Sequence, residues 1–185
     1  MSRPPEPQGR LEISSFPEFY GYWSPRLTRY LKTQTSDGRW VEDIAQDAML
    51  AARGKWEELL TYDRPEVWLF KVATRMLRRW QAKAREQCTS LDEMVDRRAG
   101  SPLVPDADEW VNDHIVLIAA IRTLPRRQRE VLALHCLAGH TLAGTAQIMG
   151  ITEGTAKTHL HRARKTLQEM MDSPRSTGEH LRRRA

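Results

Sequence analysis

The chain has 185 residues, of which 40% are hydrophobic and 29% are charged, as is typical of a soluble folded protein with a charged surface. No stretch approaches the roughly 18 apolar residues that a membrane-spanning helix needs. The polar, proline-rich start of the chain lacks the apolar run of a secretion signal, so we expect a cytoplasmic protein without membrane insertion. Cys88 and Cys136 stand far apart and in no CxxC pattern, which favours free thiols.

The net charge of +5 is distributed unevenly. Residues 64–85 carry +6 and residues 111–185 carry +6, whereas residues 1–63 carry −2 and residues 86–110 carry −5. Clustered positive charge favours nucleic-acid binding, because each neutralised phosphate releases counterions. Solvated helix faces would show the same clustering, so charge alone leaves both interpretations open.

Helical periodicity dominates the first half of the chain and predicts three helices. In the first, aromatic residues and leucines recur at three- and four-residue steps over residues 16–31, and Pro25 predicts a kink or a break. After a polar turn at residues 36–38, the second has an apolar stripe made of Val41, Ile44, Ala45, Ala48, Met49 and Ala52.

The third helix should begin at Pro65 and run to about Arg85. Its spacing predicts a buried stripe made of Trp68, Leu69, Val72, Ala73, Met76 and Trp80. The outward face should carry Lys71, Thr74, Arg78 and Arg85, with Arg75 on the flank. The positive charge of this segment therefore projects away from a packed helix.

Residues 87–110 are predicted to be a flexible acidic linker, because prolines and a glycine interrupt them and their apolar residues have no period. Beyond it we predict helices over residues 111–123, 126–137 and 141–149, and a long basic helix to about Met171. A short helix, a tight turn at Gly150 and a longer basic helix form a helix-turn-helix pattern.

The predicted fold class is therefore all-α, with two small helical domains joined by a flexible acidic linker. The first domain spans residues 14–86, and the second, a helix-turn-helix domain, spans residues 111–171. Residues 1–13 are expected to be a disordered N-terminus and residues 172–185 a basic tail.

The long helix near the C-terminus has two distinct faces. Thr152 should cap it, and its buried stripe is predicted to be Ala156, Leu160, Ala163, Leu167 and Met170. The opposite face would enter a DNA major groove and carries Gly154, Thr158, His161, Arg162 and Lys165, flanked by Lys157 and Arg164 for phosphate contacts. A solvated face of a bundle helix is the alternative.

Neither acidic residues nor histidines predict a metal site. His159 and His161 would point about 200° apart on a helix and could not chelate one ion. Asp43 and Asp47 lie one helical turn apart, as a solvated acidic face would place them. We see no glycine-rich phosphate loop and no nucleophile with a base, so we expect no enzyme, no metal and no cofactor.

Four motifs, in this order, resemble the extracytoplasmic-function (ECF) sigma factors of bacterial RNA polymerase. Residues 41–50 (VEDIAQDAML) are similar to a helix of the family's conserved region two, and residues 68–75 (WLFKVATR) to the stretch that follows it. Residues 124–132 (LPRRQREVL) and residues 150–158 (GITEGTAKT), followed by Arg162-Ala163-Arg164, resemble helices of region four. The resemblance covers about residues 14–171.

The resemblance implies a factor that binds core RNA polymerase, melts the promoter's minus-ten element and reads its minus-35 element. The implied partners are promoter DNA, the clamp helices of the beta-prime subunit, the flap of the beta subunit and an anti-sigma factor. The implied core-binding residues are Glu42, Asp43, Gln46, Asp47 and Arg53. The implied minus-ten residues are Tyr62, Asp63, Arg64, Trp68, Lys71, Thr74, Arg75 and Arg78. The implied minus-35 residues are Thr152, Glu153, Gly154, Thr155, Lys157, Thr158, His161, Arg162 and Lys165.

The chain departs from the family pattern at some of these positions. The family often has Asn where Arg75 stands. It usually has Glu-Ile where this chain has Gly144-Thr145, and these two residues weaken the first helix of the helix-turn-helix. A LuxR-type helix-turn-helix regulator, which would not need core polymerase, is the alternative function, because residues 129–132 and 155–159 resemble that family too. The first half, however, lacks the alternating strands and helices of a receiver domain.

Overall fold

The computed structural model describes residues 13–35, 37–89 and 109–172, and all regular structure in these ranges is helical, which confirms the predicted all-α class. The first half contains α1 (Phe16–Gln34), the 3-10 turn η1 (Gly38–Trp40), α2 (Val41–Gly54), α3 (Trp56–Leu59) and α4 (Pro65–Thr89). The second half contains α5 (Glu109–Thr123), α6 (Arg126–Leu132), the π-helical turn η2 (Ala133–Leu137), α7 (Leu142–Met149) and α8 (Glu153–Asp172).

Several boundaries differ from those predicted. α4 continues to Thr89, past the predicted end near Arg85, and α3 is a short helix beyond the three predicted for the first half. The helix predicted over residues 126–137 changes to π-helical turns after Leu132. The predicted terminal tails and linker lie almost entirely outside the described residues. The side chains of Arg85 and Cys88 lie outside them too. Cys136 is a free, exposed thiol, as predicted.

Helices α1, α2 and α4 form a bundle around an apolar core. α1 begins with a capping box, in which the Ser15 amide donates to the Glu18 carboxylate at 3.3 Å and the Glu18 amide donates to the Ser15 hydroxyl at 3.5 Å. The helix runs unbroken through Pro25, so of the predicted kink or break, the break does not occur. Pro25 and Gly21 are both exposed, and water can therefore bond the Gly21 carbonyl that proline leaves without a helical partner.

The predicted buried stripe is confirmed for α2, where all of its residues are buried, and only in part for α4. In α4, Trp80 is 37% exposed, and burial extends instead to Phe70, Thr74 and Leu77. Three residues of the predicted stripe are only half-buried, and they are Trp68, Val72 and Met76. α4 packs against α2 on one side and α7 on another, so its buried surface is wider than the one stripe that periodicity predicts.

The second half has the predicted helix-turn-helix. Thr141 caps α7 by accepting from the Gly144 amide at 3.0 Å, and α7 ends at Gly150, whose φ of 67° is left-handed. Thr152 caps α8, since its hydroxyl accepts from the Thr155 amide at 3.2 Å. Ala156, Leu160 and Ala163 are buried as predicted, where α8 packs on α6 and α7. Leu167 is only half-buried and Met170 is 44% exposed, so the predicted stripe is wrong for the end of α8.

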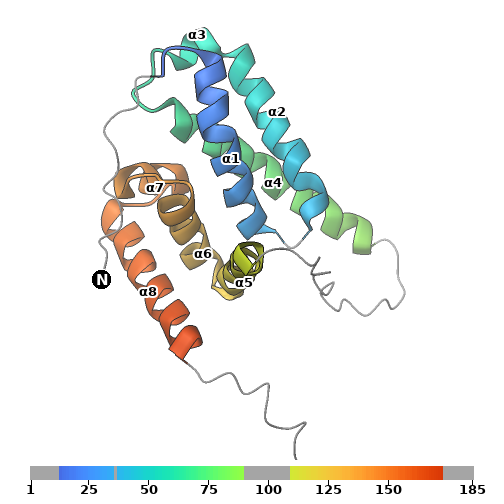
Figure 1. The fold of residues 1–185 in the computed structure, drawn as a ribbon. Helices are drawn as coiled ribbons and strands as arrows, with labels where there is room; N and C mark the ends of the chain where they lie inside the picture. The colour runs from blue at the N-terminus through green and yellow to red at the C-terminus, as the bar shows by residue number, and fades with distance from the viewer. Residues whose placement is uncertain (1–12, 36, 90–108, 173–185) are drawn as a thin grey trace, which may run out of the picture.

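The two halves pack directly against each other. α5, α6 and η2 contact α1, and α7 contacts α4. Figure 1 shows α6 and α7 between the first bundle and α8, which lies on the outside of the molecule. Among the described helices, none combines the length and the apolar character that crossing a membrane requires.

Candidate nucleic-acid and protein interfaces

The outer face of α2 is acidic and exposed. Glu42, Asp43, Gln46 and Asp47 all point away from the bundle core, as predicted. Glu42 pairs with Lys32 of α1 at 3.3 Å, and both side chains are about half exposed. The other carboxylates of this face remain accessible to a partner.

Leu50 lies on the same face of α2 and was missed by sequence reasoning. Its side chain is 68% exposed, the largest exposed fraction among the large hydrophobic residues of the described chain. It follows Gln46 and Asp47 by one helical turn, so it shares their side of the helix. The available signal was a leucine outside the predicted apolar stripe. A protein that bound this face would remove the Leu50 side chain from water.

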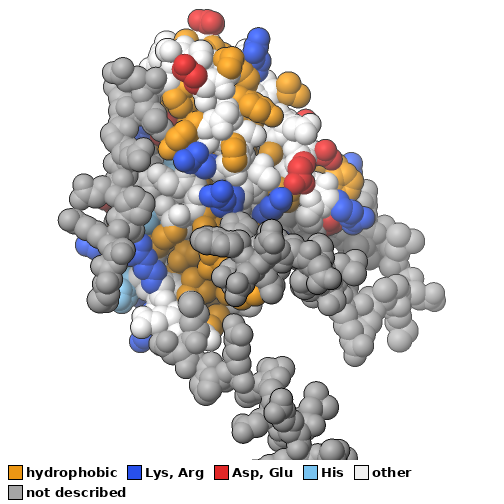
Figure 2. Space-filling model, in the orientation of Figure 1, with side chains coloured by type: hydrophobic (Ala, Val, Ile, Leu, Met, Phe, Trp, Pro, Cys, Tyr) orange, Lys and Arg blue, Asp and Glu red, His pale blue; other side chains and the backbone are white. Residues whose placement is uncertain are grey.

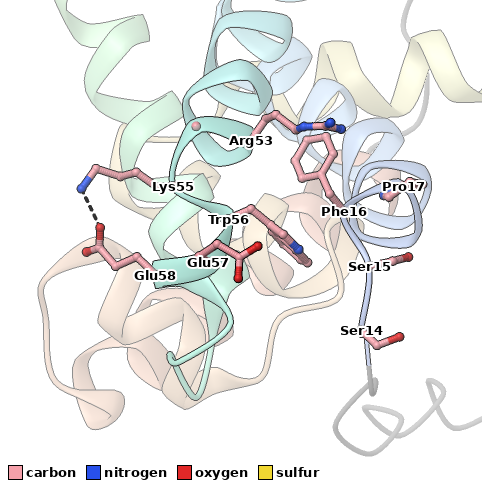
Figure 3. A pocket seen from close by; sticks show the side chains of 10 residues that line it. Ser14, Ser15, Phe16, Pro17, Arg53, Lys55, Trp56, Glu57 and Glu58 are labelled. Carbon is pink, nitrogen blue, oxygen red and sulfur yellow. Dashed lines mark hydrogen bonds and ion pairs between the residues drawn. The ribbon is translucent and has the colours of Figure 1, made fainter.

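An open groove of about 710 Å³ lies beside the C-terminal end of α2. The Arg53 guanidinium lies over the Phe16 ring at 5.2 Å, and the Phe16 and Trp56 rings meet edge to face at 5.5 Å. Figure 3 shows Arg53 reaching toward Phe16 on one side and the Lys55–Glu58 ion pair, 2.9 Å long, on the other. This packing holds Arg53 at the edge of the α2 face.

The predicted minus-ten residues separate into three groups in the structure. The first group consists of exposed Tyr62, Asp63, Lys71 and Arg75, together with half-buried Trp68. The Tyr62 hydroxyl donates to the Glu58 carboxylate at 2.6 Å, which raises the pKa of Tyr62 and lowers that of Glu58. Lys71 and Arg75 lie one turn apart on the outside of α4, where they can follow a phosphate backbone.

Thr74 is not an outward residue, so its predicted placement on the exposed face of α4 is wrong. It is 8% exposed, and its hydroxyl lies 3.0 Å from the Tyr30 hydroxyl, between α4 and α1. Burial raises the pKa of Tyr30 well above its usual range, so the phenol stays protonated and keeps this hydrogen bond. Thr74 therefore holds α4 to α1.

Arg64 and Arg78 form the third group, because both contact the second half of the chain. Arg64 Nη1 donates to the Thr141 hydroxyl at 3.1 Å, and Arg78 Nη2 lies 3.0 Å from Glu130 Oε1. These two predicted DNA-binding cations are therefore engaged within the molecule.

A pair of tryptophans at the end of the first bundle was also missed. Trp40 and Trp80 stack with ring centroids 4.7 Å apart and an angle of 16° between the planes. Arg39 and Lys83 lie over the two rings at 5.9 and 5.8 Å. Sequence spacing gives no signal for this pair, since the residues lie forty positions apart in different elements.

The outward face of α8 is positively charged, as predicted. Its exposed side chains are Glu153, Thr155, Lys157, Thr158, His161, Arg162, Arg164 and Lys165, and Thr152 and Gly154 at its start are exposed too. Figure 2 shows Lys, Arg and His side chains gathered at the lower left, where Figure 1 places α8. A Cβ on Gly154 would meet nothing within 4 Å, so the backbone is open to close approach. The geometry fits a helix in a major groove.

Two kinds of comparison with known proteins identify the family of this chain. The family described as Sigma-70 region 2 matches residues 19–86, and Sigma-70 region 4 matches residues 114–167. The ECF RNA polymerase sigma factor SigL of Mycobacterium tuberculosis is 33% identical over 153 residues, which is 78% of this chain and 84% of SigL. The ECF RNA polymerase sigma factor SigF of Caulobacter vibrioides is 33% identical over 135 residues, 71% of this chain and 70% of SigF.

The fold is similar to that of a solved sigma factor. The sigma factor RpoE from Bartonella quintana, in complex with the anti-sigma factor NepR, has a TM-score of 0.66 and 22% identity, covering 88% of this chain and 100% of RpoE. The match of the first half to region 2 also leaves the receiver-type regulator without support. The chain belongs to the ECF sigma factors of RNA polymerase, which direct the polymerase to promoters.

Proposed function

We propose that this sigma factor docks on core polymerase through α2, captures the melted minus-ten element with α4 and the loop before it, and reads the minus-35 element with α8. The observation that carries this assignment is the separation of charge. The exposed face of α2 is acidic, whereas the exposed faces of α4 and α8 are basic. The acidic face would bind a protein, and each of the two basic faces would bind a segment of promoter DNA.

For core polymerase, we assign Asp43, Gln46, Asp47 and Leu50 to contact with the clamp helices of the beta-prime subunit. Carboxylates on the rim steer the approach of a basic partner, and a leucine at the centre can be desolvated on binding. Arg53, held over Phe16, marks one end of this surface. The second half would contact the flap of the beta subunit.

For promoter DNA, we assign Lys71 and Arg75 to the phosphates of the separated minus-ten strand. Capture of single-stranded DNA needs cations along the backbone and rings on which bases stack. Exposed Tyr62 in the preceding loop and half-buried Trp68 of α4 would supply such rings. On α8, Lys157 and Arg164 flank the helix for phosphate contacts, and Thr158, His161 and Arg162 face the base edges.

An anti-sigma factor is the regulator that we propose for this chain. The relative RpoE is recorded in complex with the anti-sigma factor NepR. A protein that covered the exposed faces of α2 or α8 would block their access to polymerase or DNA, because each face carries charges that remain accessible in the free chain.

Run-off transcription with core polymerase and a promoter library tests the proposed function. The wild-type chain should give start sites that core polymerase alone does not give. Lys71→Glu with Arg75→Glu should abolish open-complex formation and spare core binding, because these residues lie on the exposed face of α4 and not on the acidic face of α2. Asp43→Arg with Asp47→Arg should do the reverse and abolish core binding. Loss of core binding in the α4 variant would show that the two faces are wrongly assigned.

A further inference from the structure

The stacked tryptophans at the end of the first bundle keep much of their surface in water. Trp40 is 38% exposed and Trp80 is 37% exposed, and neither belongs to a surface assigned above. Their stacking joins the start of α2 to the last turns of α4. Figure 2 shows apolar, acidic and basic side chains together at the right edge of the described surface, where Figure 1 places these two helix ends.

Contacts on both sides hold this tryptophan pair in place. The Asp37 carboxylate accepts two hydrogen bonds from the Arg39 guanidinium, both 3.0 Å long, and one from the Trp40 side chain, and these bonds lower the pKa of Asp37. Gln81 Nε2 donates to the Gln34 carbonyl at 3.3 Å, which ties this part of α4 to the end of α1. Rings that are fixed before a partner arrives lose little conformational freedom on binding.

Trp40 continues the exposed face of α2. Its backbone is already helical, with φ of −99° and ψ of −1°, and it precedes Asp43 by three residues and Asp47 by seven. Residues at these spacings share one side of a helix. Leu50 follows on the same side, so apolar side chains lie on both sides of the two carboxylates over about 15 Å. Trp80, stacked on Trp40, widens this surface onto α4.

The surroundings of the tryptophan pair favour a protein partner over a nucleic acid. Each ring is stacked on the other, and a cation lies over each, Arg39 at 5.9 Å and Lys83 at 5.8 Å. A nucleobase therefore finds no open ring face on which to stack. The carboxylates of Asp43 and Asp47 on the same side also repel phosphates. The exposed edges of the indoles fit an apolar recess of a protein, and tryptophans are enriched among the residues that dominate binding energy at protein interfaces.

We propose that the tryptophan pair is a second apolar anchor of the polymerase-binding surface, seated in an apolar recess of the same partner that faces Asp43, Asp47 and Leu50. The inference rests on the proposed function, because it extends the α2 surface assigned there. The partner presents basic groups opposite the carboxylates and apolar groups opposite Leu50 and the tryptophans. The carboxylates steer its approach, and the fixed rings set the register in which α2 docks.

Hydroxyl-radical footprinting tests this contact on the full chain in three states: alone, with core polymerase, and with core polymerase and promoter DNA. Mass spectrometry follows the oxidation of each residue. Trp40 and Trp80 should be reactive in the free chain and become severalfold less reactive when core polymerase alone is added. Tyr62, which is 36% exposed, is the matched aromatic control. It is assigned to the minus-ten element, so it should stay reactive with core polymerase and become protected only with DNA.

Three footprints overturn the anchor. The tryptophans stay reactive in every state, they become protected only when DNA is added, or they become protected in the free chain as its concentration rises. The second outcome assigns them to DNA, and the third assigns them to contact between two copies of the chain.

Affinity for core polymerase gives a second measurement. Trp80→Ala should raise the Kd about fivefold, because it removes one ring and the support of the other. Trp80→Phe keeps a ring that can stack on Trp40, so it should recover most of the affinity. Val116→Ala, at an exposed site on α5, is the control and should leave the Kd unchanged. Urea unfolding verifies that each variant is folded, and an unchanged Kd in folded Trp80→Ala overturns the anchor. If Trp80→Ala does not fold, the footprint of the wild-type chain decides.

Failure of this inference and failure of the proposed function give different results. If Asp43→Arg with Asp47→Arg abolishes core binding but the tryptophans are neither protected nor needed, the anchor is wrong and docking through α2 stands. If core polymerase protects the tryptophans but the arginine variant binds it normally, the assignment of the α2 carboxylates is wrong and the anchor stands.

Discussion

His140 shows how strongly the contact between the halves acts on one residue. Burial against Trp23 and Phe70, with further repulsion from Arg64 and His135, lowers the pKa of His140 to about 3. The folded chain therefore keeps this imidazole neutral near pH 7. Its Nε2 atom has no hydrogen-bond partner, so the ring contributes through stacking with its neighbours.

The free energy of unfolding should decrease as the pH is lowered, because of His140. Its folded pKa of about 3 lies below the ordinary value of 6.5, so below about pH 6.5 the unfolded chain takes up a proton that the folded chain does not. The stabilisation is present in full above pH 6.5 and is lost progressively toward pH 3. We expect a loss of roughly 2 kcal/mol between pH 7 and 5, measured by urea unfolding. His140→Phe should remove this loss, and exposed His161→Gln should retain it. The same pH dependence in His140→Phe would contradict the assignment.

Leu50 is the residue of the α2 face for which we predict the largest single effect on polymerase binding. Leu50→Ala should raise the Kd for core polymerase on the order of tenfold, because truncation removes an apolar anchor at the centre of a charged surface. Stability should not change, since the side chain is 68% exposed. Val116→Ala, an exposed site on α5, is the control. Fluorescence anisotropy with labelled sigma factor measures the Kd of each variant for core polymerase. Equal Kd values for the two variants would contradict the prediction.

At the scale of elements, the helix-turn-helix depends on two glycines with opposite roles. Gly150 ends α7 in a left-handed conformation, which turns the chain tightly enough for α8 to pack on α7. Gly154 lies inside α8 with open space where a side chain would be. One glycine is therefore needed for folding, whereas the other leaves room for a partner.

The two glycines should respond oppositely to alanine. Gly150→Ala should destabilise the chain by about 1 kcal/mol, because an L-residue at a φ of 67° is strained. Gly154→Ala should stabilise it by about 0.5 kcal/mol through helix propensity and weaken binding to minus-35 duplex DNA. Chemical denaturation and a DNA titration distinguish these outcomes. Unimpaired DNA binding by Gly154→Ala would mean that the backbone of α8 does not approach the duplex closely.

At the scale of the whole molecule, the docked halves should behave as one unit. The Arg78–Glu130 pair and the stacked His140 couple the two halves, so each loses contacts when the other unfolds. We expect one cooperative transition in calorimetry for the wild type. Glu130→Gln should split or broaden it, because the halves then unfold with less coupling. Two separate transitions in the wild type would show that the contact is too weak to couple them.

Prediction from sequence succeeded where a pattern is local. The buried stripe of α2, the cap at Thr152, the turn at Gly150 and the exposed basic face of α8 each follow from residues along one helix or at its ends. Helical periodicity and capping chemistry are short-range effects, so the chain specifies them without its tertiary neighbours.

Prediction from sequence failed where one helix packs against several neighbours. Thr74 has the spacing of an outward residue on α4, yet α1 covers it and Tyr30 shares a hydrogen bond with it. Trp80 has the spacing of a core residue, yet it is partly exposed and stacks on Trp40. Periodicity identifies one face of a helix, and α4 packs against more than one neighbour.

The sequence by itself therefore determined the all-α class, the helix-turn-helix and the three charged faces, because these depend on spacing and charge along single helices. Only the tertiary structure decided which of those charges are free. Arg78 and Glu130 lie fifty-two positions apart, and no local pattern pairs them. Whether a cation meets DNA or a carboxylate of its own chain depends on long-range packing, since a Coulomb interaction is set by distance in space and by burial.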